Sequence, residues 1–361
     1  MRINDGSKLL AYVLSATDLS IKDLLEFEEY EFKRDTEFSD KSSIVANGKP
    51  NIAKGDFVLC QSDGGNVFTG VCDDYKSSSD STAYTLTLRQ QECLFDRFIF
   101  ISQESIISGT GIEDFIANAI TANWISSGDA ALDRSYMTAV AQTHTPVYAK
   151  VSTIVSLTDG AYNLKTFLGN ALEYYGIYVD FDFSVSGALT VKIYHSSATD
   201  ASVDATVSDV TEYTETYSVD ALAKLQVRWK LNDEDTNPTS RTYYLKTDRS
   251  ITTDGTDPDR ADGSVRAMEI VAETENEMYQ TVVDEFARNS YAHKISFLLS
   301  MASRLYDYTQ FYPGHGTTIK TKSGVRNSIV TGLTISSSSR FAQVVFGKLK
   351  VTLIEKLRGM Q

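Results

Sequence analysis

Two stretches that are far apart in the chain have the same order of strands and turns. This internal repeat constrains the fold more than any other feature of the sequence. The first stretch runs from Gly55 to Gln90 and the second from Gly316 to Leu353. In each, a glycine-containing turn joins two short β-rich runs, and a serine-rich loop then leads to a long alternating strand. A repeat of this size is typical of one small β-domain that occurs twice in a chain.

Both copies carry a Thr-Gly pair in their middle strand, Thr69-Gly70-Val71 in the first and Thr331-Gly332-Leu333 in the second. A glycine inside a strand permits the close approach of another backbone or a kink in the strand. We therefore predict that these residues lie at contacts between subunits. A bulge that is internal to one domain is the alternative explanation, and the sequence leaves both open.

The composition is that of a globular, β-rich protein. Of the 361 residues, 42% are hydrophobic and 23% are charged, and only five are proline. Ser, Thr, Tyr and Val are frequent in segments that favour strands. The length allows two to four domains, and we predict a fold of the α+β class that is mostly β.

Residues 1–102 are predicted to form an N-terminal β-barrel-like domain. Five short β-rich runs are separated there by Gly, Asn, Asp and Ser turns, a spacing that fits a small barrel or sandwich. The runs are Glu26–Asp35, Ser43–Ala46, Asp56–Gln61, Val67–Tyr75 and Ala83–Arg89.

Residues 103–205 are predicted to form an α+β domain. Apolar residues from Ile112 to Ile120 recur at helical spacing, and so do those from Leu164 to Leu172. Asn163 is placed to cap the second helix and Gly176 to end it. Two alternating strands follow that glycine, so two helices packed on a sheet are expected.

Residues 206–361 are predicted to form a second β-barrel-like domain with a helical insertion around 264–310. Within it, Thr274 and Glu277 have the spacing of a capping box at the start of a helix. The second copy of the repeat then completes the domain. The predicted architecture is therefore two related β-barrel-like domains that flank an α+β domain.

Tyrosines are numerous, 20 in all, and several gather near the start of the second copy. Tyrosine combines a large rigid surface with a polar tip, which suits protein interfaces and sugar stacking. We predict an interface role for Tyr306, Tyr308 and Tyr312, with ordinary strand packing as the alternative.

The charged and reactive residues argue against nucleic-acid binding, metal binding and catalysis. A net charge of −14 is unsuited to gripping nucleic acid, although DNA could slide past such a surface. The three cysteines form no CxxC pair and the four histidines have no zinc-site spacing. No apolar run reaches the ~18–20 residues of a membrane helix. We expect no catalytic residue, no cofactor, no metal and no membrane insertion.

The order of units resembles the baseplate hub proteins of tailed phages. These include the N-terminal hub part of the tail-associated lysin (Tal) family of siphophages. The resemblance covers nearly the whole chain and uses local segments as well as domain order. Those segments are Asn163–Ile177, Tyr243-Tyr244-Leu245-Lys246 and Val330–Ile335.

The resemblance implies a homotrimeric ring at the virion tail tip, assembled in the host cytoplasm. Two related β-domains per chain would give the ring a pseudo-sixfold surface beneath the distal tail or tail-tube protein. The ring would surround or close the DNA channel, through which DNA passes without specific binding. A tape-measure protein and receptor-binding or tip proteins are the further partners implied.

The hub part of this family has no catalytic residues, so the resemblance implies a structural protein and not an enzyme. The chain stops at Gln361, soon after the second copy, and we expect any lytic domain to be encoded elsewhere. Two alternatives remain: a peptidoglycan-degrading tail-tip protein that uses a carboxylate pair, and a cell-wall-binding or carbohydrate-binding protein that uses its tyrosines.

Overall fold

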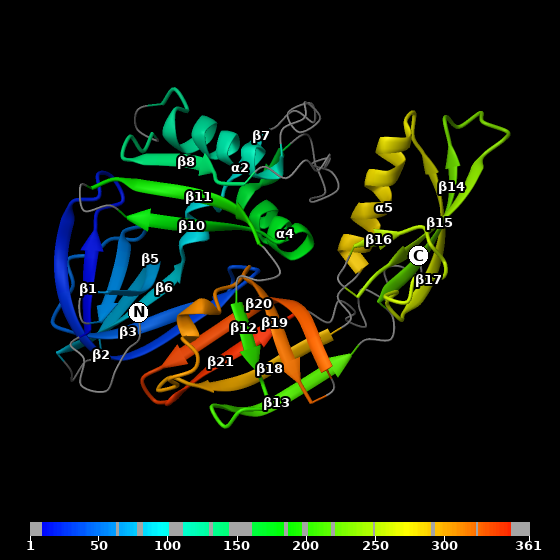
Figure 1. Cartoon of the computed structure of the whole chain (residues 1–361). Coiled ribbons are helices and arrows are strands. Elements are labelled where there is room, and N and C mark those ends of the chain that lie inside the picture. Colours follow the sequence, from blue (N-terminus) through cyan, green and yellow to red (C-terminus); the bar gives the residue numbers. More distant parts are fainter. Residues whose placement is uncertain are drawn as a thin grey trace.

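The fold is α+β and mostly β, with two barrel-like units, an α+β unit and a smaller unit with one helix (Figure 1). It is taken from a computed structural model. The residues described are 9–62, 65–77, 82–100, 111–129, 133–143, 161–183, 187–196, 201–217, 221–247, 250–289, 293–322 and 324–347.

The first barrel is a closed ring of six antiparallel strands. Along the ring the strands lie in the order β1-β4-β5-β6-β3-β2, and β2 pairs with β1 to complete it. The five strands predicted for this region are confirmed as β2 to β6. The strands are β1 (Leu9–Leu14), β2 (Ile21–Asp35), β3 (Lys41–Asn47), β4 (Phe57–Ser62), β5 (Gly65–Ser77) and β6 (Ala83–Gln90).

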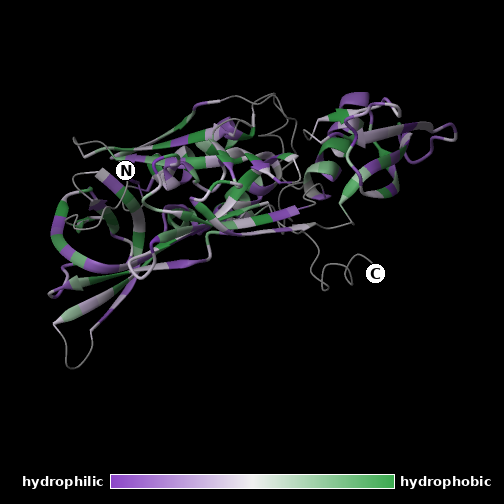
Figure 2. Ribbon diagram, turned by 60° about the horizontal axis from the view of Figure 1, so that its bottom comes forward, coloured by the Kyte–Doolittle hydropathy of each residue, from purple (hydrophilic) through white to green (hydrophobic). Residues whose placement is uncertain are grey.

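Alternating apolar residues of these strands fill the barrel, as the two-residue period of a strand requires. Phe32 lies parallel to Phe68 with ring centroids 4.5 Å apart, and Phe27 meets Phe32 edge to face. Figure 2 shows the resulting alternation of hydrophobic and hydrophilic residues along the strands. Cys60 and Cys72 are buried in this core, and all three cysteines are unpaired.

The second barrel has the strand order β12-β19-β20-β21-β18-β13. All neighbours are antiparallel except β12 and β19. A short turn joins β12 to β13, so the chain itself bridges the seam where these two strands do not pair. The elements are β12 (Ala201–Asp204), β13 (Val210–Tyr217), β18 (His293–Ser300), η3 (Tyr308–Gln310), β19 (Gly316–Thr321), β20 (Gly324–Ser336) and β21 (Phe341–Phe346).

The predicted repeat is present as two three-stranded meanders, β4-β5-β6 and β19-β20-β21, with the same hydrogen-bond register. Cys72 exchanges backbone hydrogen bonds with Gly55 and Asp56, and Val330 does so with Gly314 and His315. Both glycines have positive φ, 93° at Gly55 and 100° at Gly314. The residue after Cys72 and the residue after Val330 each form a bulge against the next strand.

This register corrects the sequence alignment of the two Thr-Gly pairs. Because Cys72 is equivalent to Val330, the counterpart of Gly332 is Asp74, four residues beyond Gly70. The shared letters Thr-Gly therefore do not mark equivalent positions.

The α+β unit has a three-stranded sheet in the order β10-β11-β8, with α2 packed against β8 and β11, and α4 against β10 (Figure 1). The predicted ends of the second helix are confirmed. Asn163 Oδ1 accepts a hydrogen bond from Thr166 N, and Gly176 has a φ of 66°. The elements are η1 (Gln91–Phe95), β7 (Phe98–Phe100), α2 (Ile112–Ile120), η2 (Thr121–Ile125), β8 (Met137–Ala141), β9 (Ala161–Asn163), α4 (Leu164–Tyr175), β10 (Ile177–Phe183) and β11 (Leu189–His195).

The fourth unit is inserted between β13 and β18, which pair with each other. It has its own core, in which Met278, Val282 and Phe286 of the helix cover one face of the sheet β16-β15-β14-β17. The insertion thus contains strands as well as the predicted helix, and β18 belongs to the barrel. Its elements are β14 (Leu222–Lys230), β15 (Thr239–Leu245), β16 (Ile251–Thr252), β17 (Ser264–Val271) and α5 (Glu275–Asn289).

The predicted cap by Thr274 is confirmed at α5, but the return bond of Glu277 goes to the residue before the cap. Thr274 Oγ1 accepts from Glu277 N at 3.3 Å, and Glu277 Oε2 accepts from Glu273 N at 3.2 Å. The division into domains at 1–102, 103–205 and 206–361 stays a prediction. Strand β12, at the end of the second range, pairs with β19 of the second barrel.

Candidate functional site at the junction of the barrels

The two barrels share one continuous sheet, because the last part of β2 pairs antiparallel with the last part of β20. The register places Glu31 opposite Ser336 and Asp35 opposite Gly332. Beyond this ladder, Ser337 N donates to Tyr30 O at 2.9 Å. The junction is therefore a main-chain ladder between strands that lie about 300 residues apart in sequence.

A cavity of about 180 Å³ lies at this junction, where both barrels meet the α+β unit. It brings together Thr69 and Leu333 with Tyr308 and Tyr312, four of the residues predicted from the sequence. Arg34, Gln91 and Asp180 also line it and were not predicted. No sequence motif distinguishes these three, since β2, η1 and β10 meet only in the folded chain.

Arg34 is the main polar contact across the cavity. Its guanidinium lies 4.3 Å from the ring centroid of Tyr312 and 4.9 Å from that of Phe68, and it donates a hydrogen bond to Tyr312 Oη. Burial raises the pKa of the Tyr312 hydroxyl above its usual value, and the nearby Arg34 charge partly opposes this. These contacts attach the η3 segment of the second barrel to β2 and β5 of the first.

Glu92 is a buried carboxyl next to this cluster, in η1, and is 3% exposed. Its Oε2 has no hydrogen-bond partner among the residues that the structure describes. Burial raises the pKa of Glu92 to about 7, although the Arg34 charge opposes the shift. The junction therefore contains a carboxyl that is held near its titration point at neutral pH.

Thr69, Gly70 and Val71 lie on β5 of the first barrel, and Val71 packs in the core of the α+β unit. Thr69 is 1% exposed, and a Cβ added at Gly70 would lie 2.8 Å from the carbonyl oxygen of Arg89. The glycine thus permits the close approach of β5 and β6 within one chain. Any contact of these residues with another subunit stays a prediction.

Thr331, Gly332 and Leu333 lie where β20 turns from its own barrel to the first one. Thr331 is the bulged residue, while Gly332 and Leu333 are opposite Asp35 and Arg34 of β2. A bulge, the alternative explanation, is thus observed in the second copy. Gly332 and Leu333 also contact the first barrel, which belongs to the same chain and not to another subunit.

Each of the three tyrosines is packed or hydrogen-bonded within the chain. Tyr308 is 1% exposed, Tyr306 Oη accepts from Asp204 N at 2.9 Å, and Tyr312 bonds to Arg34 as described above. Their predicted role in contacts with partner proteins stays untested by this geometry.

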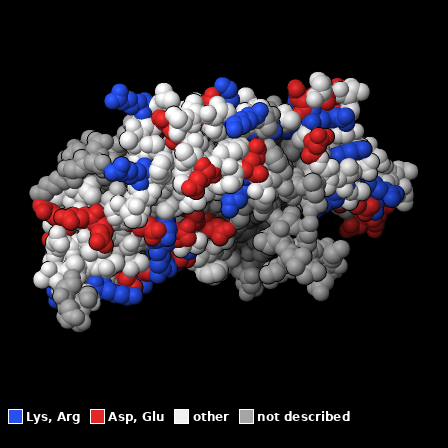
Figure 3. Space-filling view, turned by 90° about the horizontal axis from the view of Figure 1, so that it is seen from below, with Lys and Arg blue, Asp and Glu red and all other residues white. Residues whose placement is uncertain are grey.

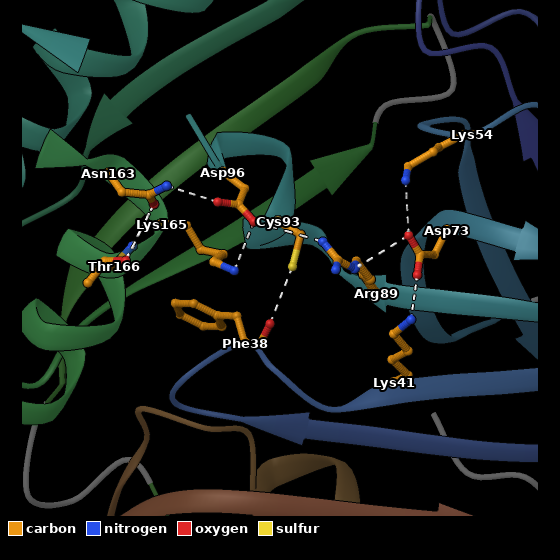
Figure 4. Close-up of polar contacts among 10 residues, drawn as sticks. All are labelled: Phe38, Lys41, Lys54, Asp73, Arg89, Cys93, Asp96, Asn163, Lys165 and Thr166. Atoms are coloured by element: carbon orange, nitrogen blue, oxygen red, sulfur yellow. Dashed lines mark hydrogen bonds and ion pairs between the residues drawn. The ribbon is translucent and has the colours of Figure 1, made fainter. Parts of the chain in front are cut away.

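A second polar cluster joins the first barrel to α4 (Figure 4). Asp73 on β5 accepts from Lys41 at 2.7 Å and lies 3.6 Å from Arg89. The hydrogen bond from Lys41 holds the pKa of Asp73 below its usual value. Asp96 continues the chain of contacts, because it lies 3.8 Å from Arg89 and 2.9 Å from Lys165 of α4.

The inserted unit touches the rest of the chain through its helix. Tyr175 Oη at the end of α4 donates a hydrogen bond to Asp284 of α5, which also accepts from Gln280 Nε2 at 2.9 Å. The unit is otherwise a separate lobe in Figures 1 and 2.

Acidic and basic side chains are interspersed on the face seen in Figure 3, with wide uncharged areas between them. Within the described ranges, no three His, Cys, Asp or Glu residues are grouped so that they could hold a metal ion. The described helices include none that is long and apolar enough to cross a membrane.

Comparison with solved structures identifies similar folds. The chain is similar to the 43 kDa tail protein of prophage MuSo2 from Shewanella oneidensis, with 12% identity, a TM-score of 0.52 and coverage of 95% of this chain and 98% of that one. It is also similar to a tail protein from Neisseria meningitidis, with 12% identity, a TM-score of 0.51 and coverage of 95% and 96%. A prophage tail protein, gp18 of Listeria monocytogenes, matches with 8% identity, a TM-score of 0.50 and 98% coverage of both chains.

No protein-family model matches the sequence, and no curated protein matches it. At such low identities the structural matches establish a shared fold over nearly the whole chain. The chain thus has the same fold as these three tail proteins.

Proposed function

We propose that this protein is a structural hub of the tail tip or baseplate of a phage or phage-like particle. Three copies form a ring that joins a sixfold tail tube or distal tail protein to a threefold tip. The ring surrounds or closes the DNA channel, and DNA passes without specific binding. Tape-measure and receptor-binding proteins are its further partners, and the protein acts in the virion without catalysis.

One observation carries this proposal: two barrels with equivalent three-stranded meanders are joined within one chain by a main-chain ladder. A chain with two equivalent domains gives a trimer six similar domains around one axis. Such a ring can match a sixfold partner on one face while its differences leave threefold symmetry on the other. The shared fold with tail proteins supports the same role.

The proposal is tested first by the mass of the purified chain in solution, alone and mixed with the tail-tube or distal tail protein of the same particle. A trimer in either condition is the expected result. A monomer in both conditions, together with loss of turbidity when the chain is added to a cell-wall suspension, would favour the wall-degrading alternative instead.

A further inference from the structure

The end of β20 in the second barrel pairs with β2, whereas the equivalent end of β5 in the first barrel has a free edge among the described residues. In the second barrel, β19 covers β20 only as far as Ile329, and Gly332–Ser336 beyond it pair with β2. In the first barrel, β4 covers β5 as far as Val71, and the next backbone contacts end at Cys72. Beyond that point, Asp74–Ser77 pair with β6 on one side, and no described strand lies on the other.

Strand β2, which pairs with the end of β20, also has an equivalent in the second barrel. Leu88 and Phe346 are equivalent, because each lies opposite one of the equivalent residues Cys72 and Val330. Following the ladders onwards makes β3 equivalent to β18 and β2 equivalent to β13, with Lys33 matching Thr216. The final part of β13 pairs with β18, and its second edge faces no strand within the described residues.

The free edges of β5 and β13 are therefore equivalent to the edges of β20 and β2, which join the two barrels within the chain. Both are exposed: Asp74–Ser77 are exposed on β5, and so are Thr214 and Thr216 on β13. An unpaired strand edge presents backbone donors and acceptors that another strand can satisfy. Neither segment contains a proline, which would remove a donor.

We propose that β13 of one subunit pairs antiparallel with the end of β5 of the next subunit, so that a second copy of this chain repeats the junction seen within it. Within the chain, Lys33 lies opposite Thr334. The equivalent pair across the subunit boundary is Thr216 opposite Lys76, which places no like charges together. The inference rests on the proposed ring and specifies its strand register.

The geometry of this contact accounts for a closed assembly. Its two surfaces differ, so each subunit offers one edge to each neighbour, as in a heterologous ring. The contact between subunits repeats the contact between the two barrels of one chain. Each barrel is therefore related to the next by a similar rotation about the axis. Three chains then give six similar steps.

The test is disulfide cross-linking of the full chain carrying Lys76→Cys and Thr216→Cys. Opposite residues of an antiparallel pair have Cα atoms about 4.5–5.5 Å apart, which is within the range that a disulfide bridges. Mild oxidation should give covalent dimers and trimers on a non-reducing gel, with at least a tenfold excess over either single variant. Both residues are exposed, so the substitutions should leave the fold intact, and circular dichroism checks this.

Two matched variants serve as controls. Lys33→Cys with Thr334→Cys places the equivalent pair within one chain and should give an internal disulfide without oligomers. Asn66→Cys with Thr216→Cys keeps the same two strands but moves the thiol ten residues, roughly 33 Å, along β5 and should give none.

A trimer by mass that fails to cross-link at positions 76 and 216 overturns this strand pairing and leaves the proposed ring intact. A chain that stays monomeric alone and with its tail partner overturns both. Equal cross-linking in the variant with Asn66→Cys would show random collision and also contradict the pairing.

Discussion

Replacement of the buried carboxyl by Glu92→Gln should change how stability depends on pH. The carboxyl is 3% exposed and its pKa is raised from 4.5 to about 7. Because the folded chain binds this proton more tightly than the unfolded chain, the stabilisation is complete below pH 4.5 and is lost as pH rises through about 7. The shift corresponds to about 3 kcal/mol, since one pKa unit is worth about 1.4 kcal/mol.

Urea unfolding at pH 5 and pH 8 measures this effect. The fluorescence of Trp124 can report unfolding in a Trp229→Phe background. The Trp124 ring lies 5.2 Å from that of Phe95, and Phe95 belongs to the same short helix as Glu92. The parent should lose about 2.5 kcal/mol more than the variant between the two pH values, because part of the full effect is already lost at pH 5.

The control is Glu28→Gln, which removes an exposed carboxyl from β2 and should keep the parental pH dependence. Equal pH dependence in the parent and in the variant with Glu92→Gln would refute the argument that burial dominates at this carboxyl.

Three further substitutions test other contacts. Gly70→Ala should destabilise the chain by about 1–3 kcal/mol through overpacking against β6, whereas Gly332→Ala, whose added Cβ meets its nearest atom at 3.4 Å, should cost clearly less in the same thermal unfolding assay. Asp73→Asn should cost at most about 1 kcal/mol at pH 7, because its partners are partly exposed, and the difference should vanish as pH falls through the lowered pKa of Asp73. Tyr175→Phe should weaken the contact between α4 and α5 by about 1 kcal/mol and speed hydrogen exchange in α5, while unchanged exchange would contradict a role for this bond.

Local signals in the sequence predicted much of the fold. Asn163 with Gly176, and Thr274 with Glu277, mark helix ends through short-range hydrogen bonds, so the residues themselves carry the information. The strands β2 to β6 follow from alternation, and the two meanders follow from repeated turns.

Long-range pairing could not be predicted in the same way. Nothing near β2 in sequence indicates that its last residues pair with β20, and the bulges that set the register have no residue signature. The likeness of Thr69-Gly70 to Thr331-Gly332 therefore suggested an equivalence that is four residues out of register. The junction cavity was missed as a whole because its lining residues come from three separate units.

The central claim is that three chains place six similar barrels around one axis. Single-particle electron microscopy of the purified chain, alone and with its tail-tube partner, tests it most directly. The account predicts threefold rings with six similar barrel densities around a central opening wide enough for duplex DNA. Particles that hold a single chain in both samples, or rings in which the barrels of neighbouring chains do not touch, would contradict it.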